Sequence, residues 1–111
     1  MEREIYTWLE DIWLAIAEIE SFLPGAESFL QFRNDLKGKR AIERNLEIIG
    51  EAVNRILKVR QDLQITHARK IIDTRNRIAH GYDTVSDEVI WTIVTTDLKF
   101  LKEEINLLIN N

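Results

Sequence analysis

A shortage of helix-breaking residues constrains this chain more than any other feature of its sequence. It holds one proline and four glycines in 111 residues, whereas an all-β sandwich or barrel needs turn residues roughly every 8 to 12 positions. Apolar residues recur instead at steps of three and four, as on one face of a helix. They include Ile5, Leu9, Ile12, Ile16, Ile19 and Leu23; Ile42, Leu46, Ile49, Val53, Ile56 and Leu57; and Ile90, Val94, Leu98, Leu101, Ile105 and Leu108. We therefore predict an all-α fold, an up-down antiparallel bundle of four main helices.

Boundary signals place these helices along the chain. Pro24-Gly25 is expected to end the first, and a fifth, short helical turn is expected around Phe29 to Phe32. The second should run from about Lys39 to Arg60 and the third from about Thr66 to Ala79. Ser86 is a good N-cap for the last helix.

Three features of these segments allow two interpretations each. Val89 to Thr96 is rich in β-branched residues and could form a strand, but the apolar stripe continues through it, which favours one long helix. Gly50 lies in mid-helix, where glycine costs up to about 1 kcal/mol relative to alanine; it marks either a close approach of two helices or an exposed site. Aromatic residues off the stripes either widen the core or form a surface for a second subunit; they are Trp8, Trp13, Trp91 and Phe100.

Length and composition indicate one domain over residues 1–111. Charged residues make up 31% of the chain and apolar ones 45%, which is not typical of a disordered segment. The absence of cysteine excludes disulfides, thiol catalysis and cysteine-ligated zinc. Met1-Glu2-Arg3-Glu4 does not resemble a signal peptide, and no apolar run approaches the roughly 20 residues that cross a bilayer. We expect a cytoplasmic domain with no membrane association.

The net charge of −4 conceals an uneven distribution. Residues 1–32 carry one base and seven acids, residues 33–77 carry twelve bases and six acids, and residues 78–111 carry two bases and six acids. The three parts therefore have charges of −6, +6 and −4. The basic middle part can meet phosphate although the whole chain is acidic, but solvated helix faces explain the same composition.

The basic part ends in the segment Asp73-Thr74-Arg75-Asn76-Arg77-Ile78-Ala79-His80-Gly81-Tyr82. On an uninterrupted helix, Arg75 and His80 would lie about 140° apart. They share a face only if the helix ends or bends between them, and Gly81 is expected to supply that ending.

These residue types suit RNA cleavage without a metal. Histidine can move the protons of the 2′-hydroxyl and the leaving oxygen, and arginine can hold the negative charge of the phosphorane. A structural interpretation also fits, with His80 capping the helix and Arg75 paired with Asp73 or Asp83. Spacing alone favours that structural interpretation.

The pattern Arg75-x-x-x-x-His80-x-Tyr82 resembles the R-x-x-x-x-H-x-Y signature of HepT-like toxins in the HEPN superfamily. The blocks at residues 44–52, 86–91 and 98–102 resemble further parts of that family, so the likeness covers about residues 5–108. It implies a helical bundle that homodimerises, with both motifs in one shared cleft. It also implies a metal-independent ribonuclease that needs no cofactor, the toxin of a type II/VII-like toxin–antitoxin pair. The implied partner is an MntA-type nucleotidyltransferase antitoxin.

The resemblance assigns roles to five residues. Arg75 would hold the scissile phosphate and His80 would be the general acid or base. Asn76 would orient the phosphate or the histidine, and Arg77 would support RNA binding. Tyr82 would be the tyrosine that the antitoxin modifies with adenylyl groups, which places negative charge beside the cations that receive RNA.

Other residues keep two interpretations. Several arginines of the basic part could track an RNA backbone or pair with glutamates at helical spacing; they are Arg40, Arg44, Arg55 and Arg69. Glu51 could orient Arg75 or His80, although a simple ion pair is the plainer expectation, and His67 receives no role. The motif also fits a non-catalytic partner of a nucleotidyltransferase, which binds nucleotide or presents Tyr82, or a helical dimerisation module.

Overall fold

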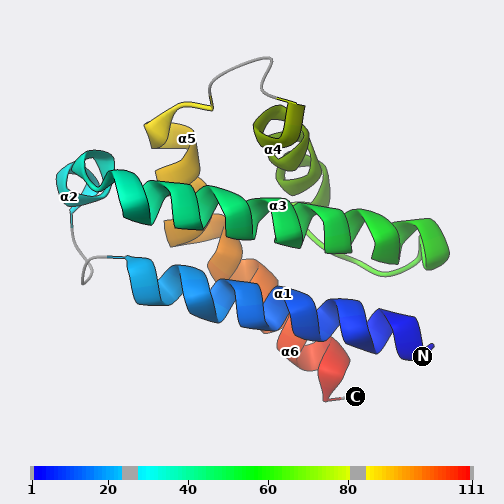
Figure 1. Ribbon diagram of the computed structural model, residues 1–111. Coiled ribbons are helices and arrows are strands. Elements are labelled where there is room, and N and C mark those ends of the chain that lie inside the picture. The colour runs from blue at the N-terminus through cyan, green and yellow to red at the C-terminus, as the bar shows by residue number, and fades with distance from the viewer. Residues whose placement is uncertain (1, 24–27, 81–84, 111) are drawn as a thin grey trace.

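The computed structural model describes residues 2–23, 28–80 and 85–110, and these residues form helices and no strand (Figure 1). The elements are α1 (Arg3–Phe22), α2 (Phe29–Asn34), α3 (Leu36–Val59), α4 (Ala68–His80), α5 (Asp87–Thr92), a π-helical turn (Ile93–Asp97) and α6 (Leu98–Ile109). The last three run on without leaving helical backbone geometry. The predicted all-α bundle of four main helices and one short one is confirmed.

Side-chain caps fix where several helices begin. The Ser28 hydroxyl accepts a hydrogen bond from the Gln31 amide at 3.1 Å, and the Ser86 hydroxyl accepts one from the Val89 amide at 3.2 Å, as predicted for Ser86. The Asp35 carboxylate accepts one from the Gly38 amide at 3.0 Å. This cap starts α3 at Leu36, three residues before the predicted Lys39. The predicted stop at Pro24-Gly25 lies outside the described residues.

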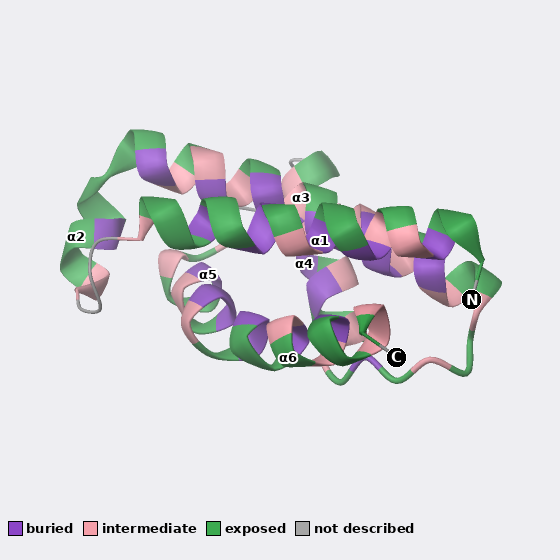
Figure 2. Cartoon of the chain, turned by 90° about the horizontal axis from the view of Figure 1, so that it is seen from below, coloured by how far each residue is buried: buried purple, intermediate pink, exposed green. Residues whose placement is uncertain are grey.

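The core lies between α3 and the helices around it. α3 packs against α1 on one side and α4 on the other, while α6 closes the bundle against α1. Figure 2 shows the buried residues as interrupted stripes along the long helices, as the apolar spacing predicted. Isoleucine dominates this interior, and the side chains of Ile5, Ile12, Ile19, Ile49, Ile56 and Ile105 are fully buried.

The off-stripe aromatic residues mostly widen the core. Trp8, Trp13 and Trp91 are partly buried and pack against the apolar cluster. The Trp91 ring lies 5.4 Å from that of Phe32, centroid to centroid, and thereby joins α5 to α2. Phe100 differs, because its side chain is 53% exposed.

The last helix is less regular than the apolar stripe predicted. Its β-branched stretch is helical, so the strand alternative is wrong, but Ile93–Asp97 form a π turn. The Thr95 hydroxyl donates to the Trp91 carbonyl at 2.6 Å, a back-bond of the kind that bends helices. The wider turn buries both Ile93 and Val94, whereas the stripe of a regular helix included only Val94.

The π turn also anchors the start of α4. It buries Asp97, whose Oδ2 lies 2.7 Å from the Lys70 Nζ and whose Oδ1 lies 3.7 Å from the His67 Nε2. About two turns further along, on α6, Glu104 accepts hydrogen bonds from the amide and hydroxyl of Thr66. His67, which received no role from the sequence, therefore helps to place α4.

The link between α3 and α4 contains an exposed ion pair. Arg60 donates to both carboxylate oxygens of Asp62, at 2.8 and 2.7 Å. The hydrogen bond from Arg60 lowers the pKa of Asp62 to about 2. The pair therefore persists as the pH falls until the carboxylate is protonated near that value.

Gly50 marks a close approach of α3 and α4. A Cβ atom built on Gly50 would lie 2.3 Å from the Cβ of Arg75 and 3.2 Å from the carbonyl oxygen of Ile71. Both are atoms of the α4 backbone or its first side-chain carbon, which cannot swing away as the end of a flexible side chain can. The close-approach interpretation of Gly50 is confirmed, and the exposed-site alternative is wrong because Gly50 is buried.

This contact predicts that Gly50→Ala destabilises the fold. Alanine gains up to about 1 kcal/mol in helix propensity, but overpacking a filled interface costs about 1 to 3 kcal/mol. We expect a lower free energy of unfolding in urea titrations, with Lys58→Ala, an exposed change on the same helix, as the control. A Gly50→Ala protein that is as stable as the wild type would show that α3 and α4 can move apart enough to admit the added methyl group without loss of stability.

Candidate active site

The motif residues stand on α4, and the α3–α4 contact decides where Arg75 points. The β-carbon of Arg75 rests on Gly50, so its side chain extends along the surface of α3. Its exposed fraction is 28%. The arginine is thus half-buried beside α3 instead of extending freely into solvent.

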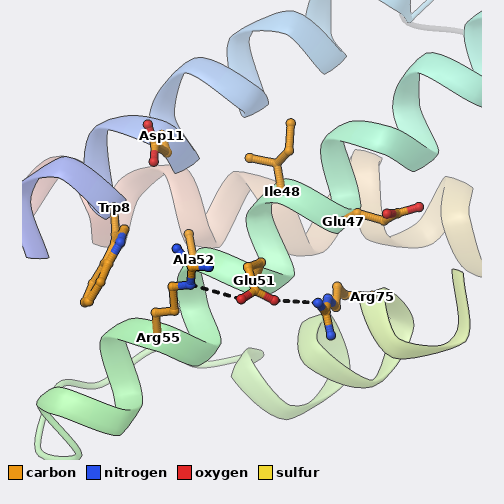
Figure 3. Close-up of a pocket in the computed structure, with 8 residues that line it drawn as sticks. All are labelled: Trp8, Asp11, Glu47, Ile48, Glu51, Ala52, Arg55 and Arg75. Carbon is orange, nitrogen blue, oxygen red and sulfur yellow. Dashed lines mark hydrogen bonds and ion pairs between the residues drawn. The ribbon is translucent and has the colours of Figure 1, made fainter. Parts of the chain in front are cut away.

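Two side chains hold the Arg75 guanidinium, and Figure 3 shows one of them, Glu51. Its Nη2 forms an ion pair with the Glu51 Oε2, and its Nη1 donates to the Asn76 Oδ1 at 2.9 Å. The other oxygen of Glu51 accepts a hydrogen bond from the Arg55 Nε at 2.9 Å. A guanidinium has five N–H donors, so these two contacts leave Arg75 with donors for a phosphate.

Arg75 borders a pocket of about 350 Å³ between α1, α3 and α4. The pocket is lined by Trp8, Asp11, Glu47, Ile48, Glu51, Ala52, Arg55 and Arg75. Three carboxylates therefore face two guanidinium groups, and the pocket has a formal charge of −1. Within one protomer, an anion reaches Arg75 in competition with Glu51.

His80 is the last residue of α4, and its side chain is exposed. The helix was expected to end or bend between Arg75 and His80, but α4 continues through His80. A regular helix keeps the two residues about 140° apart. The expectation of one shared face within a protomer is therefore wrong, and the predicted stop at Gly81 lies outside the described residues.

Of the other predicted site residues, one contacts Arg75, one lies on a different side of α4 and one lies outside the described residues. Asn76 contacts Arg75 and orients the guanidinium in this structure. Arg77 lies two positions beyond Arg75 and borders a different groove, because two residues rotate by about 200° on a helix. Tyr82 lies outside the described residues.

Some arginines of the basic part pair with glutamates on the same helix, and others do not. Arg40 pairs with Glu43 at 3.1 Å and Arg55 with Glu51 at 2.9 Å, at spacings of three and four residues along α3. Arg44 and Arg69 have no ion-pair partner within the described ranges. Glu51 joins Arg55 to Arg75, a bridge between helices that the sequence indicated only as one option.

The described part of the chain contains no group of three acidic or histidine side chains that could hold a metal ion. Its helices include none with the length and apolarity needed to cross a membrane.

The cluster of His67, Lys70 and Asp97 was not predicted, because the aspartate lies some thirty positions from its partners and only the tertiary fold joins them.

Comparison with known proteins shows which family the sequence belongs to. The sequence model of the ribonuclease HepT-like family matches residues 12–108. A protein named "Probable ribonuclease HepT" from Thermococcus cleftensis is 36% identical over 106 residues, covering 92% of this chain and 93% of its own. No solved structure matches this chain significantly.

Relatives in Methanocaldococcus jannaschii are less similar in sequence, but the matches also cover most of both chains. "Putative RNase MJ1216" is 28% identical and covers 99% of this chain and 91% of its own length. "Putative RNase MJ0125" is 27% identical and covers 99% and 95%. The family match spans most of the sequence, including the motif on α4, and the chain therefore belongs to the ribonuclease HepT-like family.

Proposed function

We propose that this protein is a metal-independent endoribonuclease, the toxin of a toxin–antitoxin pair. The observation that carries the proposal is the fixed guanidinium of Arg75, held by Glu51 and Asn76, on the helix that ends in the exposed imidazole of His80. Membership of the ribonuclease HepT-like family supports RNA as the substrate.

The reaction can be written with these two side chains. A base removes the proton of the 2′-hydroxyl, the 2′-oxygen attacks the neighbouring phosphorus, and the bond from phosphorus to the 5′-oxygen breaks. The products are a 2′,3′-cyclic phosphate and a 5′-hydroxyl that has taken up a proton. His80 moves a proton as the base or the acid, while Arg75 binds the non-bridging oxygens, whose negative charge grows in the phosphorane.

Glu51 and Asn76 prepare Arg75 for this task. An unrestrained arginine loses rotamer freedom when it binds phosphate, whereas this one already has its guanidinium plane fixed from both ends. Arginine suits the role because its planar fork binds two oxygens at once and keeps its charge. Glu51 and Asn76 are positioning residues in this scheme, and neither takes part in proton transfer.

The angle between Arg75 and His80 favours a site made by two protomers. Side chains about 140° apart on one regular helix point to different sides, which disfavours placing one phosphate between them. In a two-fold dimer the same patch of each copy meets the other, so Arg75 of one protomer can face His80 of its partner. A homodimer with both motifs in one cleft is therefore part of the proposal.

Tyr82 completes the proposal as the site of regulation. It lies two positions after His80 in the sequence, and the proposed antitoxin is a nucleotidyltransferase of the MntA type. Transfer of the first adenylyl group from ATP to the phenolic oxygen forms a phosphodiester and releases pyrophosphate, and each further group is joined to a ribose hydroxyl of the group before it. The modification would add negative charge and bulk two positions along the sequence from His80, which opposes the binding of RNA.

The first prediction concerns the motif on α4. Purified protein should cleave RNA in the presence of EDTA, and Arg75→Ala or His80→Ala should each lower the rate about 10²- to 10⁴-fold. Gel analysis of a labelled RNA and circular dichroism would measure activity and fold together. His67→Gln, a change of the only other histidine, should retain activity. Equal cleavage by the wild type and both motif variants would indicate a contaminating nuclease.

The second prediction tests the two-protomer site. If Arg75 and His80 act across the dimer, mixing Arg75→Ala and His80→Ala subunits restores one intact site in each heterodimer. Random exchange should then recover about a quarter of wild-type activity from two inactive preparations. A mixture as inactive as its components, with heterodimers shown by native mass spectrometry, would place both residues within one protomer.

The third prediction concerns Tyr82. With ATP and the cognate nucleotidyltransferase, the protein should gain mass in steps of one adenylyl group and lose its RNA cleavage. Tyr82→Phe should prevent both changes, whereas Tyr6→Phe, at the chain's other tyrosine, should not. Modification that persists in Tyr82→Phe would move the regulatory site elsewhere.

A further inference from the structure

α4 carries a second row of charged residues on the side away from Arg75. Residues 69, 73, 77 and 80 fall within an arc of about 80° on a regular helix. They are Arg69, Asp73, Arg77 and His80, and all four are exposed. This row runs along the helix and ends at the histidine of the motif.

The row borders a groove of about 460 Å³ between α4 and the start of α5. Arg69, Lys70, Asp73, Thr74 and Arg77 line it from α4, and Val85 and Val89 line it from the other side. The groove thus combines cations on one wall with small apolar side chains on the other. It is separate from the pocket beside Arg75, with which it shares no residue.

Two of the three cations in this groove are available to a ligand. The Lys70 Nζ is bound to the buried Asp97 at 2.7 Å. Within the described residues, by contrast, neither Arg69 nor Arg77 has an ion-pair partner, although Asp73 stands one helical turn from each. Elsewhere on the molecule, Arg40, Arg55 and Arg60 are all paired with carboxylates.

The spacing of these two arginines fits one strand of nucleic acid. Eight residues of helix separate Arg69 from Arg77 by about 12 Å, which corresponds to roughly three to four stacked nucleotides. Guanidinium groups bind phosphate oxygens with two parallel hydrogen bonds. Val85 and Val89 offer an apolar wall to sugars or bases in the same groove.

We infer that the groove between α4 and α5 is an RNA-backbone site that leads the strand to His80. The inference rests on the proposed ribonuclease function and adds the path of the substrate outside the catalytic pair. Arg69 and Arg77 bind phosphates about three to four nucleotides apart on the outer face of α4, and the strand continues toward His80 at the end of the same helix. Asp73, between the two arginines, weakens this binding by repulsion.

The test measures binding separately from cleavage. The probe is a fluorescent single-stranded RNA whose riboses are 2′-O-methylated, so that it lacks the attacking hydroxyl. Anisotropy titrations over a range of salt concentrations give the affinity and its salt dependence. The Arg69→Ala/Arg77→Ala double variant should bind about five- to tenfold more weakly, with a salt slope smaller by about 1 to 2. Asp73→Asn should change the affinity in the opposite direction.

A charge-matched control distinguishes the loss of RNA affinity caused by changes in the groove from the loss caused by a lower net charge. Arg3→Ala/Arg33→Ala also removes two cations, from α1 and α2, which do not line the groove. This variant should bind the probe like the wild type. Equal weakening by both double variants would overturn the inference, because the effect would then belong to the overall charge.

Cleavage of unmodified RNA, assayed in parallel, separates the two proposals. If the wild type cleaves RNA but the Arg69→Ala/Arg77→Ala protein binds the probe normally, the groove inference fails and the ribonuclease function stands. If the groove binds RNA and the wild type never cleaves it, the ribonuclease function fails. Binding of poly-glutamate through Arg69 and Arg77 in place of RNA would also overturn the inference and indicate an acidic protein partner.

Discussion

The contact of Gly50 with Arg75 and Ile71 is the constraint on which the rest of this structure depends. It sets both the separation of α3 and α4 and their relative rotation, because no side chain stands between the two backbones. That rotation brings Arg75 over α3, beside Glu51, and places Asn76 where its amide reaches the guanidinium. These two consecutive residues therefore have separate effects. Gly50 permits the close approach of α3 and α4, and Glu51 binds the guanidinium that this approach brings beside it.

Because one side of α4 is held against α3, residues at other angles around α4 must face away from α3. With Ile71 and Arg75 turned toward α3, residues 69, 73, 77 and 80 necessarily face outward. The π turn reinforces this rotation from the other side, because the buried Asp97 binds Lys70 and approaches His67 near the start of α4. α4 therefore presents Arg75 on one side and His80 on another, and the proposed reaction needs a second copy of the helix to bring them together.

The sequence predicted the fold well because the apolar spacing is regular and few residues interrupt it. It located α3 three residues late, since Asp35 caps through its own side chain, and it missed the π turn, which depends on threonine back-bonds and a buried aspartate. Within the site, the motif was visible but its geometry was not. Arg77 lies only two positions from Arg75 in the sequence yet borders another groove, because residues on a helix differ in direction by about 100° per position. The bridge from Arg55 through Glu51 to Arg75 required knowledge of how α3 and α4 are rotated.

The acidic surroundings of Arg75 are compatible with its proposed role. A phosphodiester carries one negative charge, and the phosphorane derived from it carries more. Glu51 and the nearby carboxylates reduce attraction for the substrate, but Arg75 is held in place and gains most when the extra charge develops. Such differential stabilisation accelerates a reaction, whereas equally tight binding of the ground state does not. Affinity for RNA must then come from elsewhere, and Arg69 and Arg77, which have no ion-pair partner among the described residues, can supply it without contacting the reacting phosphate. In this proposal the RNA-binding arginines lie on the same side of α4 as His80, while Arg75, which would stabilise the phosphorane, lies on the side that faces α3.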